Sequence, residues 1–506
     1  MTETARKSAI TLENSMAPPY PTAVTYDLLI IGGGINGAAI AREAALAGLK
    51  LLLVERDDLA SHTSSASTKL IHGGLRYLEF YEFKLVAEAL RERERLVKAA
   101  PHLIYPMQFV LPHDGQRPWW MLRAGLFLYD RLGGRMSLPR SRGLGAGDAA
   151  LTAPLKGTRR GFVYSDAWVD DSRLTLLNAI DAASAGGEIA TRTALVSARR
   201  EDGLWRATLS DGREVAARAL VNAAGPWVGE ALGRLGVNAR AGVRLVKGSH
   251  IVVPRLFEGD QAYILQQPDG RIVFAIPYEG AFTEIGTTDV PVDRPEDARI
   301  DASEIAYLCD AVNRHFARQI VPADVISDWS GVRPLYDDGA SEARQVTRDY
   351  VLELDTSGPP LLSIFGGKIT TARHLAEEAV GKLAQPMGLA HTPQTRARAF
   401  PGGDMPDFAR FLANVRRTWP FLGDARSLRM ARAYGTMLHD MLRSISREAQ
   451  LGQAFGGGFT EVEARWMHER EWARSPADAL ERRSKLGLHL SASERALFGD
   501  WWARTL

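Results

Sequence analysis

Residues 27–37 read Asp-Leu-Leu-Ile-Ile-Gly-Gly-Gly-Ile-Asn-Gly, an apolar run that leads directly into glycines. The apolar residues 28–31 predict a buried parallel strand. Residues 38–47 are rich in alanine and predict a helix, and a second apolar run follows at 49–54. The glycines between the first strand and the helix keep the spacing G-x-G-x-x-G and are Gly32, Gly34 and Gly37. This order predicts a Rossmann-like unit that binds a dinucleotide.

An acidic residue, Glu55, ends the second apolar run, where a carboxylate can bind the hydroxyls of an adenosine ribose. The start of the helix offers free N–H groups and a partial positive charge to a diphosphate. The alternative is an ordinary strand-to-helix turn, since glycines also mark such turns. We expect cofactor contacts from Gly32, Gly34, Ile35, Asn36, Gly37, Glu55 and Arg56.

Length and composition narrow the class of protein. A chain of 506 residues is too long for one compact core and predicts two or three domains. Its formal charge of +2, from 62 basic and 60 acidic side chains, gives no nucleic-acid-binding footprint. The single cysteine, Cys309, excludes an internal disulfide and a multi-cysteine metal site and fits a reducing compartment.

Two observations concern membranes and secretion. No apolar stretch reaches the roughly 18 residues that a membrane span needs. Residues 1–25 contain three prolines but lack the apolar core of a secretory signal, so we predict a disordered tail there. We expect a cytoplasmic protein without a metal ion.

A second loop, residues 61–77, is dense in hydroxyl side chains and contains a glycine pair. Hydroxyls and backbone amides suit phosphate oxygens and the polar edge of a flat ring, and paired glycines let a planar group lie close to the backbone. A solvated serine loop is the alternative. The cofactor contacts expected here are Ser64, Ser65, Ser67, Lys69, His72 and Gly73.

The glycine loop and residues 63–79, Thr-Ser-Ser-Ala-Ser-Thr-Lys-Leu-Ile-His-Gly-Gly-Leu-Arg-Tyr-Leu-Glu, together resemble the aerobic FAD-dependent glycerol-3-phosphate dehydrogenases, which are DAO-type flavoproteins. The resemblance extends from about residue 26 almost to the C-terminus. It implies FAD as cofactor and the oxidation of sn-glycerol 3-phosphate to dihydroxyacetone phosphate by hydride transfer to FAD. It also implies that the electrons pass to a membrane quinone, at the inner face of the cell membrane.

Two further turns fit this resemblance. Residues 219–227 predict a buried strand and a turn of small residues, which the resemblance places beside the adenosine half of FAD; Ala224 and Gly225 are its contacts. A plain strand-to-helix turn is the alternative. Residues 365–371 follow the strand 361–364 and open a helix, whose N–H groups can meet negative charge on a reduced flavin. The contacts expected here are Gly366, Gly367, Lys368, Ile369 and Thr370.

Residues with alternating β-type side chains begin a different region, at 246–254, 272–276 and 284–286. They predict an antiparallel sheet that forms a wall over the flavin. The expected fold is α/β, with a Rossmann-like FAD-binding domain, an antiparallel-sheet substrate domain and a C-terminal helical domain. We expect the FAD-binding domain at 26–400, interleaved with a substrate part mainly at 100–155 and 246–340, and the helical domain at 401–506.

A phosphorylated alcohol needs paired cations for its phosphate and a base for its hydroxyl proton. Arg76, Arg333 and Lys368 lie on loops that we expect to converge, with Tyr77 beside Arg76. His250, or a water that it holds, is the expected base, with Arg333 or Lys368 assisting electrostatically. The alternatives are surface arginines and a buried structural histidine, because both are common.

Several other segments carry simpler expectations. Residues 84–98 predict a helix whose charged run at 91–95 forms a solvated face. Residues 119–129 could lie at a membrane interface, although we expect core packing. Three carboxylates near the end of a strand suggest either a metal site or, as we expect, the cap of the next helix; they are Asp166, Asp170 and Asp171.

The C-terminal part predicts helices, for example at 428–442 and 462–474, and carries 16 basic and 13 acidic side chains. We expect it to form a cap or the surface of a homodimer. Alternative functions are a glycerol-3-phosphate oxidase that uses oxygen, another DAO-family amine or amino-acid oxidase, and a tRNA-directed dinucleotide-binding protein. The absence of a basic face argues against the last one.

Overall fold

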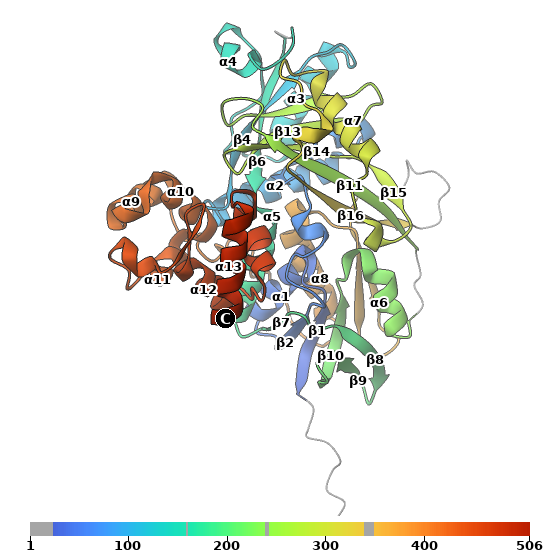
Figure 1. Cartoon of the computed structure of the whole chain (residues 1–506). Coiled ribbons are helices and arrows are strands. Elements are labelled where there is room, and N and C mark those ends of the chain that lie inside the picture. Colours follow the sequence, from blue (N-terminus) through green and yellow to red (C-terminus); the bar gives the residue numbers. More distant parts are fainter. Residues whose placement is uncertain (1–23, 158–159, 238–241, 338–348) are drawn as a thin grey trace, which may run out of the picture.

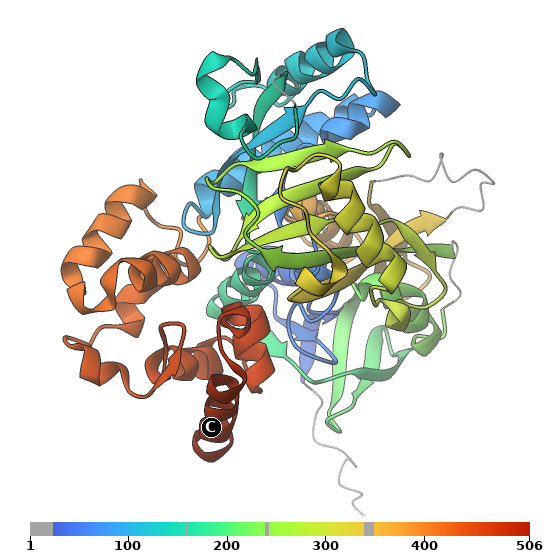
Figure 2. The same cartoon turned by 45° about the horizontal axis from the view of Figure 1, so that its top comes forward.

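The computed structural model of the chain describes residues 24–157, 160–237, 242–337 and 349–506. Two large sheets form the body of the molecule (Figure 1). The helices of the C-terminal part stand on one side of this body in both views (Figures 1 and 2). The predicted tail falls outside the described residues up to residue 23, and its last residue, Thr25, already begins the first strand.

The first sheet has the N-terminal strand at its centre, and its path is β17-β18-β10-β1-β2-β7. Strands β18, β10, β1, β2 and β7 run parallel, while β17 and the β8–β9 hairpin are antiparallel additions. The strands are β1 (Thr25–Ile31), β2 (Leu51–Val54), β7 (Glu188–Ala190), β8 (Leu195–Glu201), β9 (Leu204–Leu209), β10 (Glu214–Asn222), β17 (Val351–Asp355) and β18 (Leu361–Phe365).

Both faces of this sheet are covered, which explains the almost continuous apolar sequence of its strands. Side chains alternate between the faces of a strand. Leu28 and Ile30 therefore pack against helices α1 (Ile35–Leu46), α5 (Asp171–Ser184) and α8 (Ala372–Ala384). Leu29 and Ile31 pack on the other side, with α6 (Val228–Arg234) and the β8–β9 hairpin.

The second sheet has ten strands, with the path β15-β11-β14-β13-β12-β4-β6-β3, β16 beside β11 and β5 beside β6. Every pairing in it is antiparallel except that of β12 with β4. Its strands are β3 (Leu70–Ile71), β4 (Ile104–Pro112), β5 (Arg142–Gly143), β6 (Gly161–Val169), β11 (Gly242–Pro254), β12 (Ala262–Gln266), β13 (Ile272–Tyr278), β14 (Phe282–Gly286), β15 (Val290–Val292) and β16 (Ser327–Asp337).

Helices also cover this sheet on both faces. Helix α7 (Ala302–Asn313) packs with Ile251 and Val253 on one face. Helices α2 (Phe83–Ala99) and α3 (Trp119–Leu132) pack with Val252 on the other. A short helix, α4 (Ala149–Thr152), lies at the far end of the sheet in Figure 1.

The C-terminal part has an apolar core of its own, in which Phe455, Phe498 and Trp501 contact one another. The predicted fold class is confirmed: a Rossmann-like sheet, a mainly antiparallel second sheet and a helical C-terminal part are all present. The domain boundaries stay a prediction. The C-terminal elements are α9 (Phe408–Thr418), α10 (Gly423–Tyr434), α11 (Leu438–Met441), β19 (Ala454–Gly456), β20 (Phe459–Thr460), α12 (Glu461–Arg470), a π-helix (Asp478–Arg483) and α13 (Ala492–Thr505).

Two expected C-terminal helices have different limits in the structure. The helix predicted at 428–442 is interrupted, because α10 ends at Tyr434 and α11 begins at Leu438. Gly435, between them, has a φ of 53°, and a Cβ there would lie 2.0 Å from the carbonyl oxygen of Gly402. The chain therefore turns at this glycine where it touches another segment. Helix α12 ends at Arg470, four residues before the predicted end.

The middle of the charged run of α2, residues 92–94, is buried, so the predicted solvated face is wrong there, while Arg91 is exposed. Glu92 accepts hydrogen bonds from Arg373 at 2.7 and 2.8 Å. Arg93 donates to Asp166 Oδ1 at 2.6 Å. Glu92 and Arg93 thus meet opposite charges on other elements, which the spacing along one helix cannot reveal.

Helix α3 packs through one side only. Leu126 and Tyr129 are buried, whereas Trp120 is 71% exposed and Phe127 and Leu128 are exposed as well. The prediction of core packing therefore holds for one face of this helix. In the part of the chain that the structure describes, no helix combines the length and the apolar character required to cross a bilayer.

The three carboxylates near the end of β6 make hydrogen bonds and ion pairs with other groups of the protein. Asp170 is the N-cap of α5 and accepts a hydrogen bond from the backbone N–H of Arg173 at 3.0 Å. Asp166 accepts from Arg93 and from the hydroxyl of Tyr129. The prediction that a carboxylate of this group caps the following helix is confirmed.

Candidate cofactor and substrate site

A cavity opens where the parallel strands β1, β2, β10 and β18 end, which is the edge where open α/β sheets bind their ligands. With open solvent included, the space measures about 1100 Å³. Segments that follow each of the four strands line it. The predicted contact residues among them are Gly32, Gly34, Ile35, Asn36, Glu55, Arg56, Ser64, Ala224, Gly225, Gly366 and Gly367.

The glycine loop is tight enough to require its glycines. Gly32 has a φ of 108°, and a Cβ on it would lie 2.4 Å from the carbonyl oxygen of Ala223. A Cβ on Gly37 would lie 1.9 Å from the carbonyl oxygen of Gly32. Neither position accepts a side chain without movement of the backbone. Gly37 therefore packs against the backbone of the loop and does not line the cavity.

The rim of the cavity offers hydrogen-bonding atoms to a dinucleotide. Gly34, the N-cap of α1, has no side chain to cap this helix end, although Ser64 Oγ accepts from Ile35 N. Asn36 Oδ1 and Ser61 Oγ are buried and have no hydrogen-bond partner among the described residues. A helix start with a glycine N-cap and unpaired polar atoms beside it suits a diphosphate. The residues present therefore fit FAD.

Glu55 is held by the backbone on both sides. Its Oε2 accepts from Gly33 N at 2.6 Å, and its Oε1 accepts from Asp57 N at 2.9 Å. Burial raises the pKa of Glu55, while these two hydrogen bonds act in the opposite direction. The carboxylate is thereby fixed in direction at the cavity wall, as a group that binds ribose hydroxyls must be.

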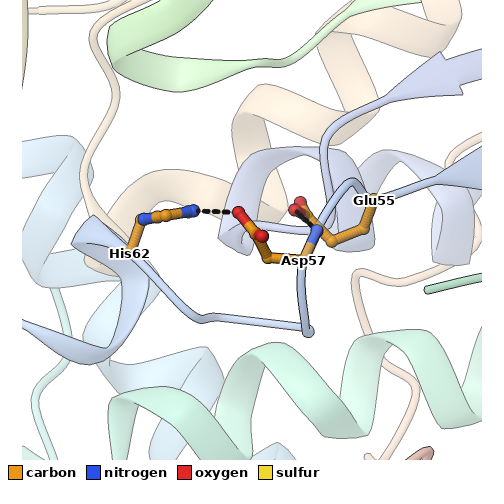
Figure 3. Close-up of side chains that lie close together, drawn as sticks. All are labelled: Glu55, Asp57 and His62. Atoms are coloured by element: carbon orange, nitrogen blue, oxygen red, sulfur yellow. Dashed lines mark hydrogen bonds and ion pairs between the residues drawn. The ribbon is translucent and has the colours of Figure 1, made fainter. Parts of the chain in front are cut away.

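Asp57 and His62 come close to Glu55, and each of the three could offer one metal-binding atom within 4.8 Å of the others (Figure 3). The contacts that they make have a simpler explanation. His62 Nε2 pairs with Asp57 Oδ2 at 2.8 Å, and the Glu55 oxygens accept backbone N–H groups. Glu55 and His62 of this cluster line the cavity wall.

An aromatic residue that the sequence reasoning missed also lines the cavity. The ring of Trp227 lies 4.1 Å from the guanidinium of Arg56 and 4.6 Å from the ring of His62. Its Nε1 donates to Glu296 at 2.6 Å. A flat ring with a guanidinium on it suits a nucleoside base. Its place in the small-residue turn after β10 was the signal that could have identified it.

Part of the hydroxyl-rich loop binds the protein instead of lining the cavity. Lys69 Nζ lies 3.2 Å from both carboxylate oxygens of Asp171, and Ser67 Oγ donates to the same carboxylate at 2.7 Å. Ser65 Oγ donates to the carbonyl of His62. Only Ser64, whose Oγ accepts from Ile35 N at 2.9 Å, lines the cavity among the four.

The turn after β18 meets the glycine loop and the segment near residue 72. Asn36 Nδ2 donates to the carbonyl of Gly366 at 3.1 Å. His72 N donates to Thr370 Oγ1 at 3.3 Å, and burial lowers the pKa of His72. Gly73 N donates to the hydroxyl of Tyr129 at 2.7 Å. The other residues of these segments that we expected at the cofactor, Lys368 and Ile369, lie just beyond the cavity lining.

Three of the predicted substrate residues form one group. Arg76 and Tyr77 belong to a short 3₁₀ helix (Leu75–Phe80), and Lys368 Nζ lies 4.3 Å from the centre of the Tyr77 ring. The Nε of Arg76 is buried and has no hydrogen-bond partner among the described residues. A buried guanidinium nitrogen without an acceptor can donate to an anionic oxygen.

His250 lies inside β11. It is 1% exposed, its Nε2 lies 2.9 Å from Thr68 Oγ1, and its ring stacks on Trp329 with centroids 5.4 Å apart. Burial, and after it the charges of Lys69 and Arg333, lowers the pKa of His250 well below its usual value. The imidazole is therefore in its neutral form at physiological pH.

Arg333 lies next to a residue that lines the cavity. Its side chain, on β16, is 44% exposed and lies 3.3 Å from Asp289 Oδ1 and 3.5 Å from Thr287 Oγ1. The next residue, Pro334, lines the cavity together with Gly366, and Lys368 follows Gly366 by two residues. The backbone next to Arg333 and Lys368 thus borders the cavity, whereas the side chains of Arg76, Arg333 and Lys368 are not part of its lining. Their catalytic and substrate-binding roles stay a prediction.

Known proteins resemble this chain over most of its length. A family model described as FAD dependent oxidoreductase matches residues 27–373. The chain is 50% identical over 502 residues to a glycerol-3-phosphate dehydrogenase of Pseudomonas aeruginosa, and the aligned region covers 97% of each protein. It is 49% identical over 490 residues to a D-erythritol 1-phosphate dehydrogenase of Brucella abortus, and the aligned region covers 94% of this chain and 98% of that protein.

A solved structure agrees with these relatives. The glycerol-3-phosphate dehydrogenase from Bacillus halodurans, solved in complex with FAD, superposes with a TM-score of 0.75 at 28% sequence identity. The match covers 95% of this chain and 90% of that one. The resemblance predicted from the sequence is therefore confirmed, and so is FAD as the cofactor. The chain belongs to the family of FAD dependent oxidoreductases.

Proposed function

We propose that the protein oxidises sn-glycerol 3-phosphate to dihydroxyacetone phosphate. The observation that carries this proposal is the 50% identity, over nearly the full length of both proteins, to a glycerol-3-phosphate dehydrogenase. Arg333 and Lys368, each next to a residue that lines the cavity, support it, because a phosphorylated substrate needs such groups. FAD, when bound, accepts the hydride that leaves the alcohol carbon.

The phosphate group binds to Arg76, Arg333 and Lys368 in this proposal. The Arg76 Nε has no acceptor among the described residues, and Arg333 has an exposed side chain with one long ion pair to Asp289. Both guanidinium groups can therefore donate to phosphate oxygens. Each charge-assisted hydrogen bond of this kind contributes roughly 1.5–3 kcal/mol. Tyr77 holds Lys368 beside Arg76 through the contact between ammonium and ring.

His250 takes the proton of the substrate hydroxyl in this proposal. Its imidazole is neutral, because burial and two nearby cations oppose protonation. The same cations stabilise the negative charge that develops on the substrate oxygen as the proton leaves. Hydrogen bonding to Thr68 fixes the ring orientation. The hydroxyl proton thus goes to the imidazole while the carbon loses hydride, which balances the oxidation.

The electrons leave to a quinone at a membrane surface in this proposal. Helix α3 supports it, since Trp120, Phe127 and Leu128 are exposed next to the exposed cations Arg123 and Arg131. Apolar side chains flanked by cations suit the interface of an anionic bilayer. An arrangement as a homodimer stays a prediction.

A second substrate is favoured by one observation, the 49% identity to a D-erythritol 1-phosphate dehydrogenase. The two phosphorylated alcohols would use the same cations and differ in chain length. Steady-state kinetics with both compounds and an artificial electron acceptor decide between them. A larger kcat/KM for glycerol 3-phosphate supports the proposal, and a larger value for D-erythritol 1-phosphate overturns it. Peroxide formed in stoichiometric amount during turnover would instead identify an oxidase.

A further inference from the structure

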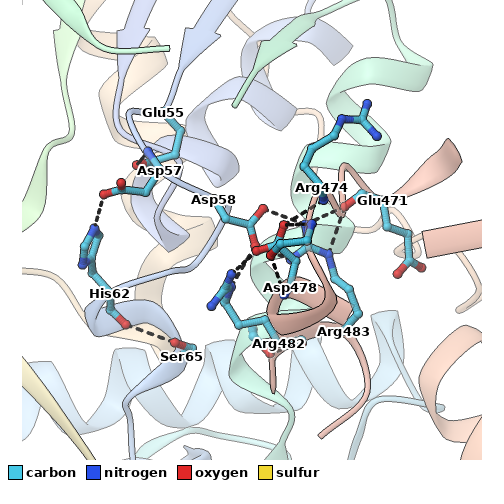
Figure 4. Close-up of polar contacts among 12 residues, drawn as sticks. Glu55, Asp57, Asp58, His62, Ser65, Glu471, Arg474, Asp478, Arg482 and Arg483 are labelled. Atoms are coloured by element: carbon cyan, nitrogen blue, oxygen red, sulfur yellow. Dashed lines mark hydrogen bonds and ion pairs between the residues drawn. The ribbon is translucent and has the colours of Figure 1, made fainter. Parts of the chain in front are cut away.

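Some side chains of the loop that follows β2 line the cavity, and another contacts the C-terminal part of the chain. Glu55 and Arg56 line the cavity, whereas Asp58 points toward the C-terminal part of the chain (Figure 4). Asp58 is 2% exposed, and its two oxygens accept from Arg483 Nη1 at 2.6 Å and Nη2 at 2.8 Å. Arg482 Nε donates to Asp58 Oδ2 at 2.8 Å. A carboxylate of the cofactor loop is thus enclosed by two C-terminal guanidinium groups.

The C-terminal side of this contact is fixed by its own bonds. Arg483 also donates to the carbonyl of Glu471, from Nε at 2.9 Å and Nη2 at 2.6 Å. Both arginines belong to the π-helix, whose first residue, Asp478, accepts from Arg474 N at 2.7 Å and Ser475 N at 3.0 Å. The guanidinium of Arg483 therefore has little freedom to follow a displaced loop.

On the cofactor side, hydrogen bonds connect Asp58 to the cavity wall. Ser61 N donates to the carbonyl of Asp58 at 3.2 Å, and Ser61 lines the cavity. Asp57 N, next to Asp58, donates to the carboxylate of Glu55 at 2.9 Å. A change in the position of Asp58 must therefore change the directions of Glu55 and Ser61. Both offer polar atoms to the cavity.

We propose that the C-terminal part of the chain helps to hold FAD through the contact of Asp58 with Arg483 and Arg482. Asp58 is a positioning residue, which touches no cofactor but fixes the loop that does. Without its charge, the buried guanidinium of Arg483 loses its carboxylate partner, Arg482 keeps only its ion pair with Asp478, and the loop loses its anchor. The inference rests on FAD binding in this cavity and does not depend on the proposed substrate.

The test uses the full-length holoprotein and measures the dissociation constant of FAD. Serial dilution releases FAD, whose fluorescence reports the free fraction. The variants are Asp58→Asn and, as a matched control, Glu463→Gln. Glu463 is equally buried and accepts from Arg429 at 2.6 and 2.8 Å, but both residues lie within the C-terminal part. Both substitutions remove one buried carboxylate charge, and only Asp58→Asn affects the cofactor loop.

We expect Asp58→Asn to raise the dissociation constant about tenfold or more, since a lost charge-assisted contact has effects of this size. Glu463→Gln should lower the melting temperature, measured at saturating FAD, without this effect. A ratio of the two dissociation constants above about fivefold supports the inference, and a smaller ratio overturns it.

A second variant guards against misfolding. If Asp58→Asn yields no folded protein, Arg482→Gln replaces it under the same criterion, because Arg482 is partly exposed and reaches the same carboxylate. Failure of this inference and failure of the proposed function remain distinguishable. The first appears in FAD affinity alone, and the second appears in the choice of substrate by a protein that holds FAD normally.

Discussion

Lys69 Nζ lies 3.2 Å from each carboxylate oxygen of Asp171, and both side chains are buried. The same carboxylate accepts from the N–H of Ser67 at 3.1 Å and from its hydroxyl at 2.7 Å. The ammonium of Lys69 also donates to the carbonyl of Ser65 at 3.0 Å. The ion pair therefore fastens the hydroxyl-rich loop to the start of α5, close to the cavity.

We predict that Asp171→Asn destabilises the protein. Removing one partner of a buried ion pair leaves the other charge uncompensated and costs about 3–5 kcal/mol of unfolding free energy. Denaturant unfolding of the holoprotein measures the loss. The control is Asp440→Asn, which removes the exposed partner of Arg443 and should change the free energy by less than about 0.5 kcal/mol. Similar losses in both variants would contradict the role given to Asp171.

Arg333→Ala should weaken substrate binding and leave the cofactor in place. Loss of one charge-assisted contact to phosphate predicts a rise in KM of roughly 10- to 150-fold. The absorbance of bound flavin per protein should stay unchanged, since the Arg333 side chain points to Asp289 and not to the glycine loop. Arg443→Ala, at a side chain 79% exposed, is the control. A variant that lost only flavin would disprove this assignment.

The pH dependence of kcat/KM tests the environment of His250. Burial, with the charges of Lys69 and Arg333, holds the pKa of this imidazole well below its usual value. The base is then neutral at pH 6.5, and kcat/KM should fall only at distinctly lower pH. The contribution of His250 to the free energy of unfolding depends on pH in the same direction. Near pH 6.5 only the unfolded chain takes up this proton, so the contribution is complete above that pH and declines below it. An acid limb centred at 6.5 or higher would contradict the assignment.

Helix α3 should mediate membrane binding. Replacing Trp120 and Phe127, which are 71% and 46% exposed, by Ser removes apolar surface without opening the core. We expect the double variant to sediment less with vesicles that contain anionic lipids, while its flavin content stays normal. Val196→Ser and Val321→Ser, at side chains 47% and 55% exposed elsewhere on the surface, serve as the control. Equal sedimentation of both double variants would rule out this helix as the membrane contact.

Local patterns predicted the cofactor half of the fold well. The strand, glycine loop, helix and second strand at residues 25–54 lie within one to three residues of their expected limits. Each element depends on neighbours in sequence, such as the contact of Gly37 with the Gly32 carbonyl. Periodicity and glycine spacing report such short-range requirements directly.

Long-range ion pairs could not be predicted in this way. Lys69 was expected at the cofactor, yet its partner Asp171 lies 102 residues away. The charged run of α2 was expected in solvent, yet Glu92 binds Arg373, 281 residues away. Asp58 and Arg483 are separated by 425 residues. A charge in a sequence does not reveal whether a counter-charge from a distant element buries it.

The most direct test of the account is an anaerobic titration of the purified protein with glycerol 3-phosphate, followed through the visible flavin band. The account predicts a yellow protein whose band bleaches as the substrate is added, with glycerol as an inactive control because it lacks the phosphate. A protein that contains flavin but keeps its band unchanged at saturating glycerol 3-phosphate would contradict it.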